Sequence, residues 1–252
     1  MATECDRTSE QRVVCWFSCG DASAVATKLA LKRYPRAIVA RIFLSDEHED
    51  NERFARDCAD WFGREIVTVT SGRYRSVEDV WKAKRYMSGI AGAPCTTAMK
   101  KEVRIAFQQP DDLQVFGYTA DEKPRAERFA AHQPEVHTWF PLVEAELTKA
   151  DCHGIIRAAG IELPAMYRLG FQNNNCIGCA KAQGAGYWNL VRQHFPELFE
   201  RRAKLSREIG CRLVKLKGKR IYLDELPVDA GIKPELEVAC SPFCEQTIAE
   251  VA

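Results

Sequence analysis

The chain has 252 residues, of which 46% are hydrophobic and 28% are charged, so it can bury a sizeable core, and disorder is not expected. Its 36 Lys and Arg residues balance 35 Asp and Glu residues, and this overall charge gives no reason to expect a nucleic-acid or membrane partner. No window approaches 18 consecutive apolar residues and the N-terminus is polar, so we expect a cytoplasmic protein.

Strands and helices alternate through the first half of the chain. Apolar runs predict strands, amphipathic runs predict helices, and both are read in chain order. The strands are expected at 12–18, 36–44, 65–71 and 113–119, and the helices at 22–34, 50–63 and 76–87. This alternation predicts an α/β fold with a mostly parallel sheet flanked by helices.

The second half of the chain is expected to be mainly helical. Helices broken by Pro and Gly turns are expected at 148–160 and 187–210, and a short basic hairpin-like piece, which could simply be solvated, at 212–226. Thr148 and Asp151 form a helix-capping pattern. We therefore expect an α/β domain at 1–140 and a helical, Cys-rich C-terminal part at 141–252, packed on the first as one unit.

The turn after the first strand, residues 18–23, reads Ser-Cys-Gly-Asp-Ala-Ser. A strand that enters a small-residue turn followed at once by a helix points backbone N–H groups and a helix N-terminus at one spot, which favours an anion. The hydroxyls of Ser18 and Ser23 could donate to phosphate oxygens, and Ser23 could instead cap the helix. An ordinary strand-to-helix turn is the alternative.

The chain contains 11 cysteines, and a disulfide framework is not expected in a reducing compartment. Five of them stand singly among helical or strand residues and are interpreted as small buried hydrophobes: Cys5, Cys15, Cys58, Cys152 and Cys211. The other six lie in or beside Gly, Pro and Asn turns: Cys19, Cys95, Cys176, Cys179, Cys240 and Cys244.

Cys95 follows Gly-Ala-Pro and precedes a helix that carries Lys100 and Lys101. A helix N-terminus and nearby cations both favour a thiolate, so Cys95 is predicted to be a reactive sulfur or an extra metal ligand. A buried cysteine at a helix start is the alternative.

The late cysteines form two close pairs, Cys176-x-x-Cys179 and Cys240-x-x-x-Cys244. Four thiolates suit either tetrahedral Zn²⁺ or a 4Fe-4S cluster, and the spacing does not choose between them. A set of buried thiols without metal is the third possibility.

Two further loops carry charge. Asp46 and Glu47 follow the second strand and could accept from ribose hydroxyls or hold Mg²⁺, with His48 next to them at the mouth of the site. The alternative is that this stretch is the polar start of a helix. Glu122 and Arg125 follow the fourth strand, where an Arg fork suits phosphate or sulfate, and an exposed salt bridge is the alternative.

The 18–23 turn is similar to the S-G-G-x-D-S pyrophosphate loop of the adenine nucleotide alpha-hydrolase superfamily, with matches at Ser18, Gly20 and Ser23. Cys19 replaces the second glycine, and Ala22 replaces the usual Asp. From Val13 to Cys244 the chain resembles the phosphoadenosine phosphosulfate reductase family, particularly its phage and prophage members. The resemblance implies a Rossmann-like fold of the alpha-hydrolase type that uses ATP or another adenine nucleotide with Mg²⁺.

The resemblance also assigns residues. It implies Cys95 and Lys100 as catalytic residues and a 4Fe-4S cluster, with Zn²⁺ as the alternative, as in cluster-bearing sulfurtransferase relatives that include the DNA phosphorothioation enzymes. The implied cluster ligands are Cys176, Cys179, Cys240 and Cys244. The implied nucleotide-binding residues are Ser18, Cys19, Gly20, Asp21, Ser23, Leu44, Asp46, His48, Thr96, Gly117, Glu122 and Arg125.

The function expected from this resemblance is ATP-dependent adenylation of an acceptor followed by sulfur insertion. Phosphoadenosine phosphosulfate reduction is a second hypothesis, although the C-terminal Glu-Cys-Gly-Leu-His segment typical of that activity is missing. A nucleotide-binding or DNA-associated accessory protein without catalysis is a third. The sulfur acceptor, whether DNA, tRNA or a small molecule, is left open, as is a homodimer.

Overall fold

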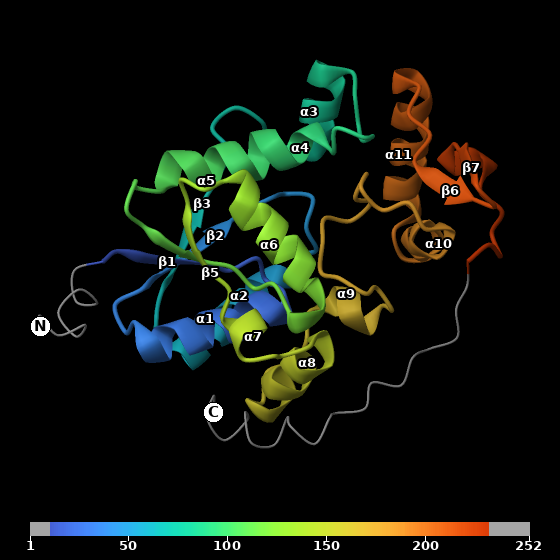
Figure 1. Cartoon of the computed structure of the whole chain (residues 1–252). Helices are drawn as coiled ribbons and strands as arrows, with labels where there is room; N and C mark the ends of the chain where they lie inside the picture. The colour runs from blue at the N-terminus through green and yellow to red at the C-terminus, as the bar shows by residue number, and fades with distance from the viewer. Residues whose placement is uncertain (1–10, 232–252) are drawn as a thin grey trace, which may run out of the picture.

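The computed structural model describes residues 11–231, and one parallel sheet forms its centre (Figure 1). The strand order is β3-β2-β1-β4-β5, and every neighbouring pair is parallel. The strands are β1 (Val13–Trp16), β2 (Ile38–Ile42), β3 (Ile66–Val69), β4 (Leu113–Val115) and β5 (His137–Trp139). The predicted α/β class with a mostly parallel, Rossmann-like sheet is confirmed.

Helices cover both faces of the sheet (Figure 1). The helices of the first half are α1 (Asp21–Arg33), α2 (Asn51–Phe62), α3 (Val77–Lys84), α4 (Pro94–Thr96), α5 (Glu102–Phe107) and α6 (Lys123–His132). Those of the second half are α7 (Pro141–Glu144), α8 (Lys149–Ala158), α9 (Ala165–Arg168), α10 (Ala185–His194) and α11 (Pro196–Ile209). Short single turns lie at Ala120–Glu122 and Leu223–Glu225, and an antiparallel ribbon of β6 (Val214–Leu216) and β7 (Lys219–Ile221) follows α11.

Strand β1 is buried at all four positions because helices cover both of its faces. Val13 and Cys15 belong to a core cluster shared with α1, α2 and α8. Val14 and Trp16 point to the opposite face, where Phe107 at the end of α5 packs against them. The period of two along the strand thus divides its side chains between two apolar layers.

The predicted strands and helices up to β4 are all present, with ends that differ by a few residues, and the hairpin-like piece is the β6–β7 ribbon. The elements that were not predicted include strand β5, the π-helical turn at Thr97–Lys101 that joins α4 to α5, and helices α6, α7 and α9. Apart from α6 they have at most five residues, too few for a hydrophobic period to be recognised in the sequence, and α6 buries only Ala126.

Packing crosses the boundary expected at residue 140. Leu142, Ile155 and Ile156 of the second part belong to the core cluster of β1 and α1. Conversely, Trp81 and Met99 of the first part belong to the cluster formed by α10 and α11. Each cluster therefore holds the two parts together. Among residues 11–231, no helix combines the length and apolarity that crossing a bilayer requires.

Candidate functional site

The strand order reverses at β1, which lies between β2 and β4, so the carboxyl ends of β1 and β4 border the crevice where open α/β sheets bind ligands. Gly117 follows β4 and lies against the first turn of α1. A Cβ atom on Gly117 would lie 2.7 Å from both N and Cα of Ser23, so no other residue fits without moving the backbone. The predicted site residues Gly117 and Ser23 are thus brought together at this edge.

The 18–23 loop has the backbone form of an anion-binding turn. Cys19 has φ +57°, a left-handed conformation that glycine adopts more easily than other residues. The Ser23 hydroxyl accepts from the backbone N–H of Ser18 at 3.0 Å and of Gly20 at 3.3 Å, and donates to the Gly20 carbonyl at 2.8 Å. The Ser23 hydroxyl therefore caps the N–H groups of this turn from within the loop.

Asp21 is fully buried at the start of α1 and is surrounded by three side chains from the second half of the chain. Lys149 Nζ donates to its Oδ1 at 2.6 Å, the Tyr167 hydroxyl donates to the same oxygen at 2.6 Å, and His153 Nε2 lies 2.9 Å from Oδ2. Burial alone raises the pKa of Asp21, but the His153 contact and the charge of Lys149 outweigh it and lower the pKa to about 2.

The ion pair between Lys149 and Asp21 affects the charge beside the 18–23 loop. An isolated carboxylate in the first turn of α1 would repel a phosphate in the adjacent loop, and the Lys149 ammonium compensates for that charge. The sequence did not reveal Lys149, His153 or Tyr167 as partners of Asp21, because they are more than 120 residues away from it.

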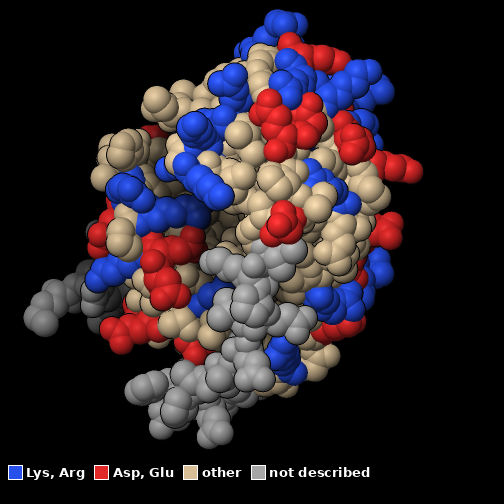
Figure 2. Space-filling model, turned by 90° about the vertical axis from the view of Figure 1, so that its right-hand side faces the viewer, with Lys and Arg blue, Asp and Glu red and all other residues tan. Residues whose placement is uncertain are grey.

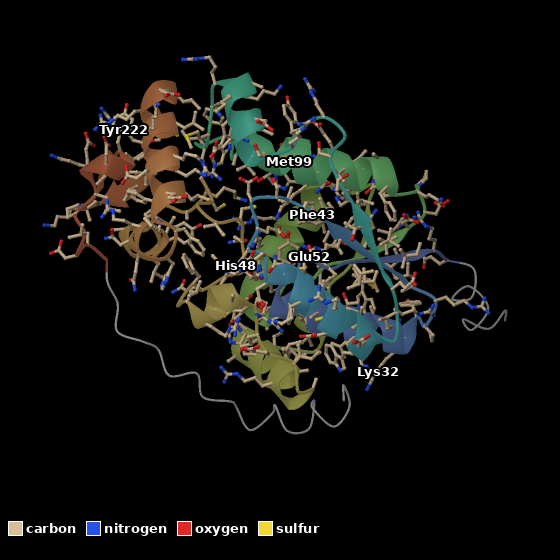
Figure 3. All side chains as sticks on the ribbon, turned by 180° about the vertical axis from the view of Figure 1, so that it is seen from behind. Lys32, Phe43, His48, Glu52, Met99 and Tyr222 are labelled. Atoms are coloured by element: carbon tan, nitrogen blue, oxygen red, sulfur yellow. The ribbon has the colours of Figure 1, made fainter. Side chains whose placement is uncertain are left out.

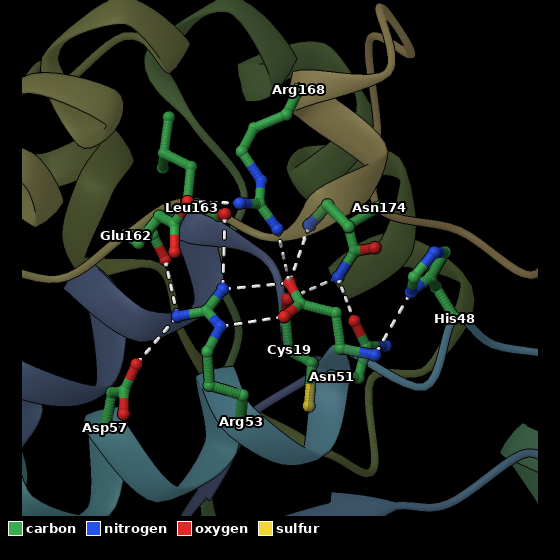
Figure 4. Close-up of polar contacts among 11 residues, drawn as sticks. Cys19, His48, Asn51, Arg53, Asp57, Glu162, Leu163, Arg168 and Asn174 are labelled. Atoms are coloured by element: carbon green, nitrogen blue, oxygen red, sulfur yellow. Dashed lines mark hydrogen bonds and ion pairs between the residues drawn. The ribbon is translucent and has the colours of Figure 1, made fainter.

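Asn174 joins the loop to the segment that carries Cys176 and Cys179 (Figure 4). Its side-chain Nδ2 donates to the carbonyl of Cys19 at 2.5 Å and to Oδ1 of Asn51 at 2.7 Å. Because a backbone carbonyl can only accept, the orientation of this amide is fixed. Its Oδ1 is buried and has no hydrogen-bond partner among residues 11–231, and in Figure 4 it lies on the side of the amide that faces His48.

Lys100 lies near residues that belong to separate motifs in the sequence. Burial lowers the pKa of Lys100, but its electrostatic interactions with Cys176, Glu47, Cys179 and Cys95 raise it, and the net shift is upward. Its Nζ is 3.8 Å from Oε1 of Glu47. We call these five residues the Lys100 cluster. The π-helical turn widens the helix between Cys95 and Lys100, and such turns are frequent at functional sites.

The same charges reach the 18–23 loop, because Lys100 and Glu47 also act on Cys19. Lys100 therefore lies within electrostatic reach of the 18–23 loop. The hydrogen bond from Asn174 to the carbonyl of Cys19 brings the segment of the first cysteine pair to the same loop.

The prediction that Cys95 is ionised at neutral pH is wrong, because the pKa of Cys95 is raised above its ordinary value. Burial is the largest effect on Cys95 and raises its pKa, while the Trp81 indole and Lys100 lower it only in part. Burial also raises the pKa of Cys19 and of Cys176 to about 12. The short α4 turn and one nearby ammonium do not compensate for the loss of solvent.

The Cys176–Cys179 pair forms a tight turn in which Gly178 has φ +66°. The Tyr187 hydroxyl accepts from the N–H of Cys179 at 2.8 Å and donates to the carbonyl of Cys176 at 3.2 Å. Within residues 11–231 no three His, Cys, Asp or Glu side chains are grouped to hold a metal ion. The other two predicted ligands, Cys240 and Cys244, lie outside the described residues.

The residues after β2 have protein partners. Asp46 accepts from Arg202 at 2.8 Å and from the N–H of Val77 at 2.8 Å, so both of its oxygens hold α3 and α11 in place. Leu44 is buried in the core shared with α10 and α11. His48 lies between α2 and the C-terminal helices, with its ring near Phe195 (Figure 3). Of these residues, His48 keeps a partly exposed side chain at the crevice.

The remaining predicted residues lie at the rim. Thr96 is exposed beside Cys95. Arg125 is exposed, pairs with Glu122 at 2.5 Å and lies 5.0 Å from the centre of the Tyr118 ring. The structure therefore has the exposed salt bridge that was the alternative to a phosphate contact at Glu122 and Arg125, and binding to an anion would require this pair to open.

Comparison with known proteins adds no identification: no protein-family model matches the chain, and no curated protein matches it.

Proposed function

We propose that the protein binds an adenine nucleotide at the 18–23 loop and uses it in ATP-dependent sulfur transfer. The observation that supports this most directly is the Asn174 amide, which holds the Cys176–Cys179 segment against the carbonyl of Cys19. A nucleotide loop and a group of thiols are the two parts that such a reaction needs, and here one side chain connects them.

In the proposed reaction, the loop binds the phosphates through its backbone N–H groups and Lys149 offsets the charge of Asp21. ATP activates an oxygen of the acceptor as an adenylate and releases pyrophosphate. The outer sulfur of a persulfide on Cys95, loaded by a sulfane-sulfur donor, then attacks the activated atom of the acceptor; the carbon–sulfur or phosphorus–sulfur bond forms as the bond to the adenylate oxygen breaks and AMP leaves. A dithiol reductant cleaves the remaining S–S bond to Cys95, which releases the sulfur-bearing acceptor, returns Cys95 as a thiol and oxidises the reductant to a disulfide. Lys100 holds the sulfur as an anion.

A metal centre fits the donor chemistry of the first cysteine pair. Cys176 and Cys179 are sulfur donors on a turn whose geometry Gly178 and Tyr187 fix, and together with Cys240 and Cys244 they would hold a 4Fe-4S cluster or Zn²⁺. A cluster would supply a site for binding sulfide, whereas zinc would stabilise the fold. Mg²⁺ would accompany the nucleotide phosphates.

One observation favours the third hypothesis, a nucleotide-binding protein without catalysis. The raised pKa values of Cys19, Cys95 and Cys176 keep these thiols protonated at neutral pH when no ligand is bound. In that case the cysteines would serve only to bind a structural metal. Metal analysis and a nucleotide-binding assay separate this hypothesis from sulfur transfer.

Thermal unfolding with and without millimolar ATP, AMP or phosphoadenosine phosphosulfate tests nucleotide binding. A ligand that binds only the folded protein raises the melting temperature by mass action. Gly20→Val should abolish the shift yet still fold, because Gly20 has φ −103° and ψ 156°, which a β-branched residue adopts readily. Gly72→Val, at a glycine with no atom within 4 Å of a Cβ, is the control and should keep the shift. A parent protein that no nucleotide stabilises contradicts the proposal.

Anaerobic purification followed by absorbance spectroscopy and metal analysis tests the metal centre. Cys176→Ser and Cys244→Ser should lose metal to a similar degree and melt earlier, because metal binding contributes directly to folding. Cys58→Ser, at a buried cysteine of α2, should keep its metal. Full metal content in either ligand variant would rule out the four-cysteine site.

A further inference from the structure

The positive charge of this chain is concentrated in two segments. Residues 82–101 and 209–220 together carry ten Lys and Arg residues and no Asp or Glu, although the whole chain has a net charge of only +1. The exposed cations among them include Lys84, Arg85 and Lys101 in the first segment. Those of the second segment are Arg212, Lys215, Lys217, Lys219 and Arg220.

The fold brings these two segments together. The Cys211 sulfur lies 3.5 Å from the carbonyl of Ser88, and Arg85 donates to the carbonyl of Glu208 at 3.4 Å. Figure 2 faces the side formed by α10, α11 and the β6–β7 ribbon and shows many Lys and Arg side chains over its upper part, with Asp and Glu side chains between them. We call the exposed cations of the two segments the basic surface.

The β6–β7 ribbon carries a like-charge pair that the fold does not need. Lys215 and Arg220 are directly opposite each other across the two strands, and both side chains are exposed. Like charges at opposed positions destabilise a sheet. Within residues 11–231, neither residue has an acidic partner, since the nearby Asp224 and Glu225 pair with Arg207. A polyanion that lies across the ribbon would relieve this repulsion.

A fully exposed apolar side chain stands beside these cations. Ile90 lies at the tip of a tight loop closed by paired hydrogen bonds between Gly89 and Gly92. An apolar side chain among phosphate-binding cations is the combination with which proteins wedge against nucleic-acid bases. The same segment continues through Pro94 to Cys95, so the basic surface leads to the proposed sulfur site.

We propose that the basic surface binds the phosphate backbone of a nucleic acid, with Ile90 in contact with its bases. As the site of a sulfur acceptor this inference rests on the proposed function, whereas binding itself can be measured without any chemistry. Charge complementarity favours a polynucleotide over a mononucleotide because the cations extend over two segments rather than converging on one point.

Fluorescence anisotropy with a labelled 20-nucleotide single strand and its duplex, each between 50 and 200 mM salt, tests the proposal. The parent should bind at least one of them with an affinity that falls steeply with salt. Lys215→Glu should weaken binding roughly tenfold and reduce the salt slope by about 1. It also places an acid opposite Arg220, so the melting temperature should not fall.

Two further variants make the test specific. Lys32→Glu changes the charge equally at an exposed residue of α1, far from Tyr222 at the end of the ribbon (Figure 3), and should leave binding unchanged. Ile90→Ser should weaken binding without changing the salt slope. The proposal is overturned if Lys32→Glu weakens binding as much as Lys215→Glu, or if neither oligonucleotide binds at 50 mM salt while vesicles containing anionic lipid do. Lys215→Glu leaves the 18–23 loop intact, so this variant should keep the ATP-induced thermal shift. That measurement distinguishes a loss of nucleic-acid binding from a loss of nucleotide binding.

Discussion

The Asn174 amide donates a 2.5 Å hydrogen bond to the carbonyl of Cys19, across 155 residues of sequence. The contact joins the loop after the first strand to the segment that carries the first cysteine pair. It also uses the carbonyl of a residue in the left-handed conformation, so it fixes the peptide on which the shape of the loop depends.

Asn174→Ala should destabilise the protein by about 1–3 kcal/mol, because it leaves the buried carbonyl of Cys19 and Oδ1 of Asn51 without this donor. The ATP-induced thermal shift should also decrease. The neighbours Asn173 and Asn175 are exposed, so Asn173→Ala and Asn175→Ala are matched controls in urea unfolding. Equal stability of all three variants would show that the Asn174–Cys19 hydrogen bond does not contribute to the free energy of unfolding.

Gly117→Ala should lower both stability and nucleotide binding, since the new methyl group would lie 2.7 Å from backbone atoms of Ser23 and push β4 away from α1. Gly72→Ala adds the same methyl group where no atom lies within 4 Å and should have little effect. Melting temperatures with and without ATP measure both quantities. A Gly117→Ala variant that behaves like Gly72→Ala would contradict the close approach.

The buried carboxylate of Asp21 should make stability depend on acid pH. Its pKa is about 2 in the folded protein against an ordinary value of 3.8, so its contribution of about 2 kcal/mol is complete above pH 4 and is lost as the pH falls from 4 to 2. Asp21→Asn should therefore be less stable than the parent at pH 6, and the difference should narrow at pH 3. Urea unfolding at the two pH values measures this, with Asp60→Asn on the exposed side of α2 as control. A difference that does not change with pH would assign the loss to packing.

Cys95 should react slowly with iodoacetamide at pH 7 in the folded protein, because burial raises its pKa above the ordinary value of 9.0. Its labelling should accelerate at alkaline pH and on unfolding in urea, as should that of Cys58, whose pKa burial also raises. Mass-spectrometric mapping follows both cysteines in one sample. Early labelling of Cys95 alone at pH 7 would show that Cys95 is ionised, as predicted from the sequence.

The sequence by itself determined the fold class and the location of the loop. The apolar runs at β1, β2 and β3 and the amphipathic runs at α1 and α2 are long enough for their periods to identify them, and Ser18, Gly20 and Ser23 stand at a strand-to-helix turn that can be recognised locally. Thr148 and Asp151 likewise form the predicted capping box, because a cap is made within four residues.

Only the tertiary structure decided which groups meet. Asp21 contacts Lys149, His153 and Tyr167 because α8 and α9 pack on α1. Lys100 lies near Cys95, Cys176 and Cys179 because α10 and α11 pack on the segment from α3 to α5. The ionisation of Cys95 was predicted wrongly for the same reason. A helix start and a nearby lysine are visible in the sequence, but the loss of solvent that outweighs them is a property of the packed protein.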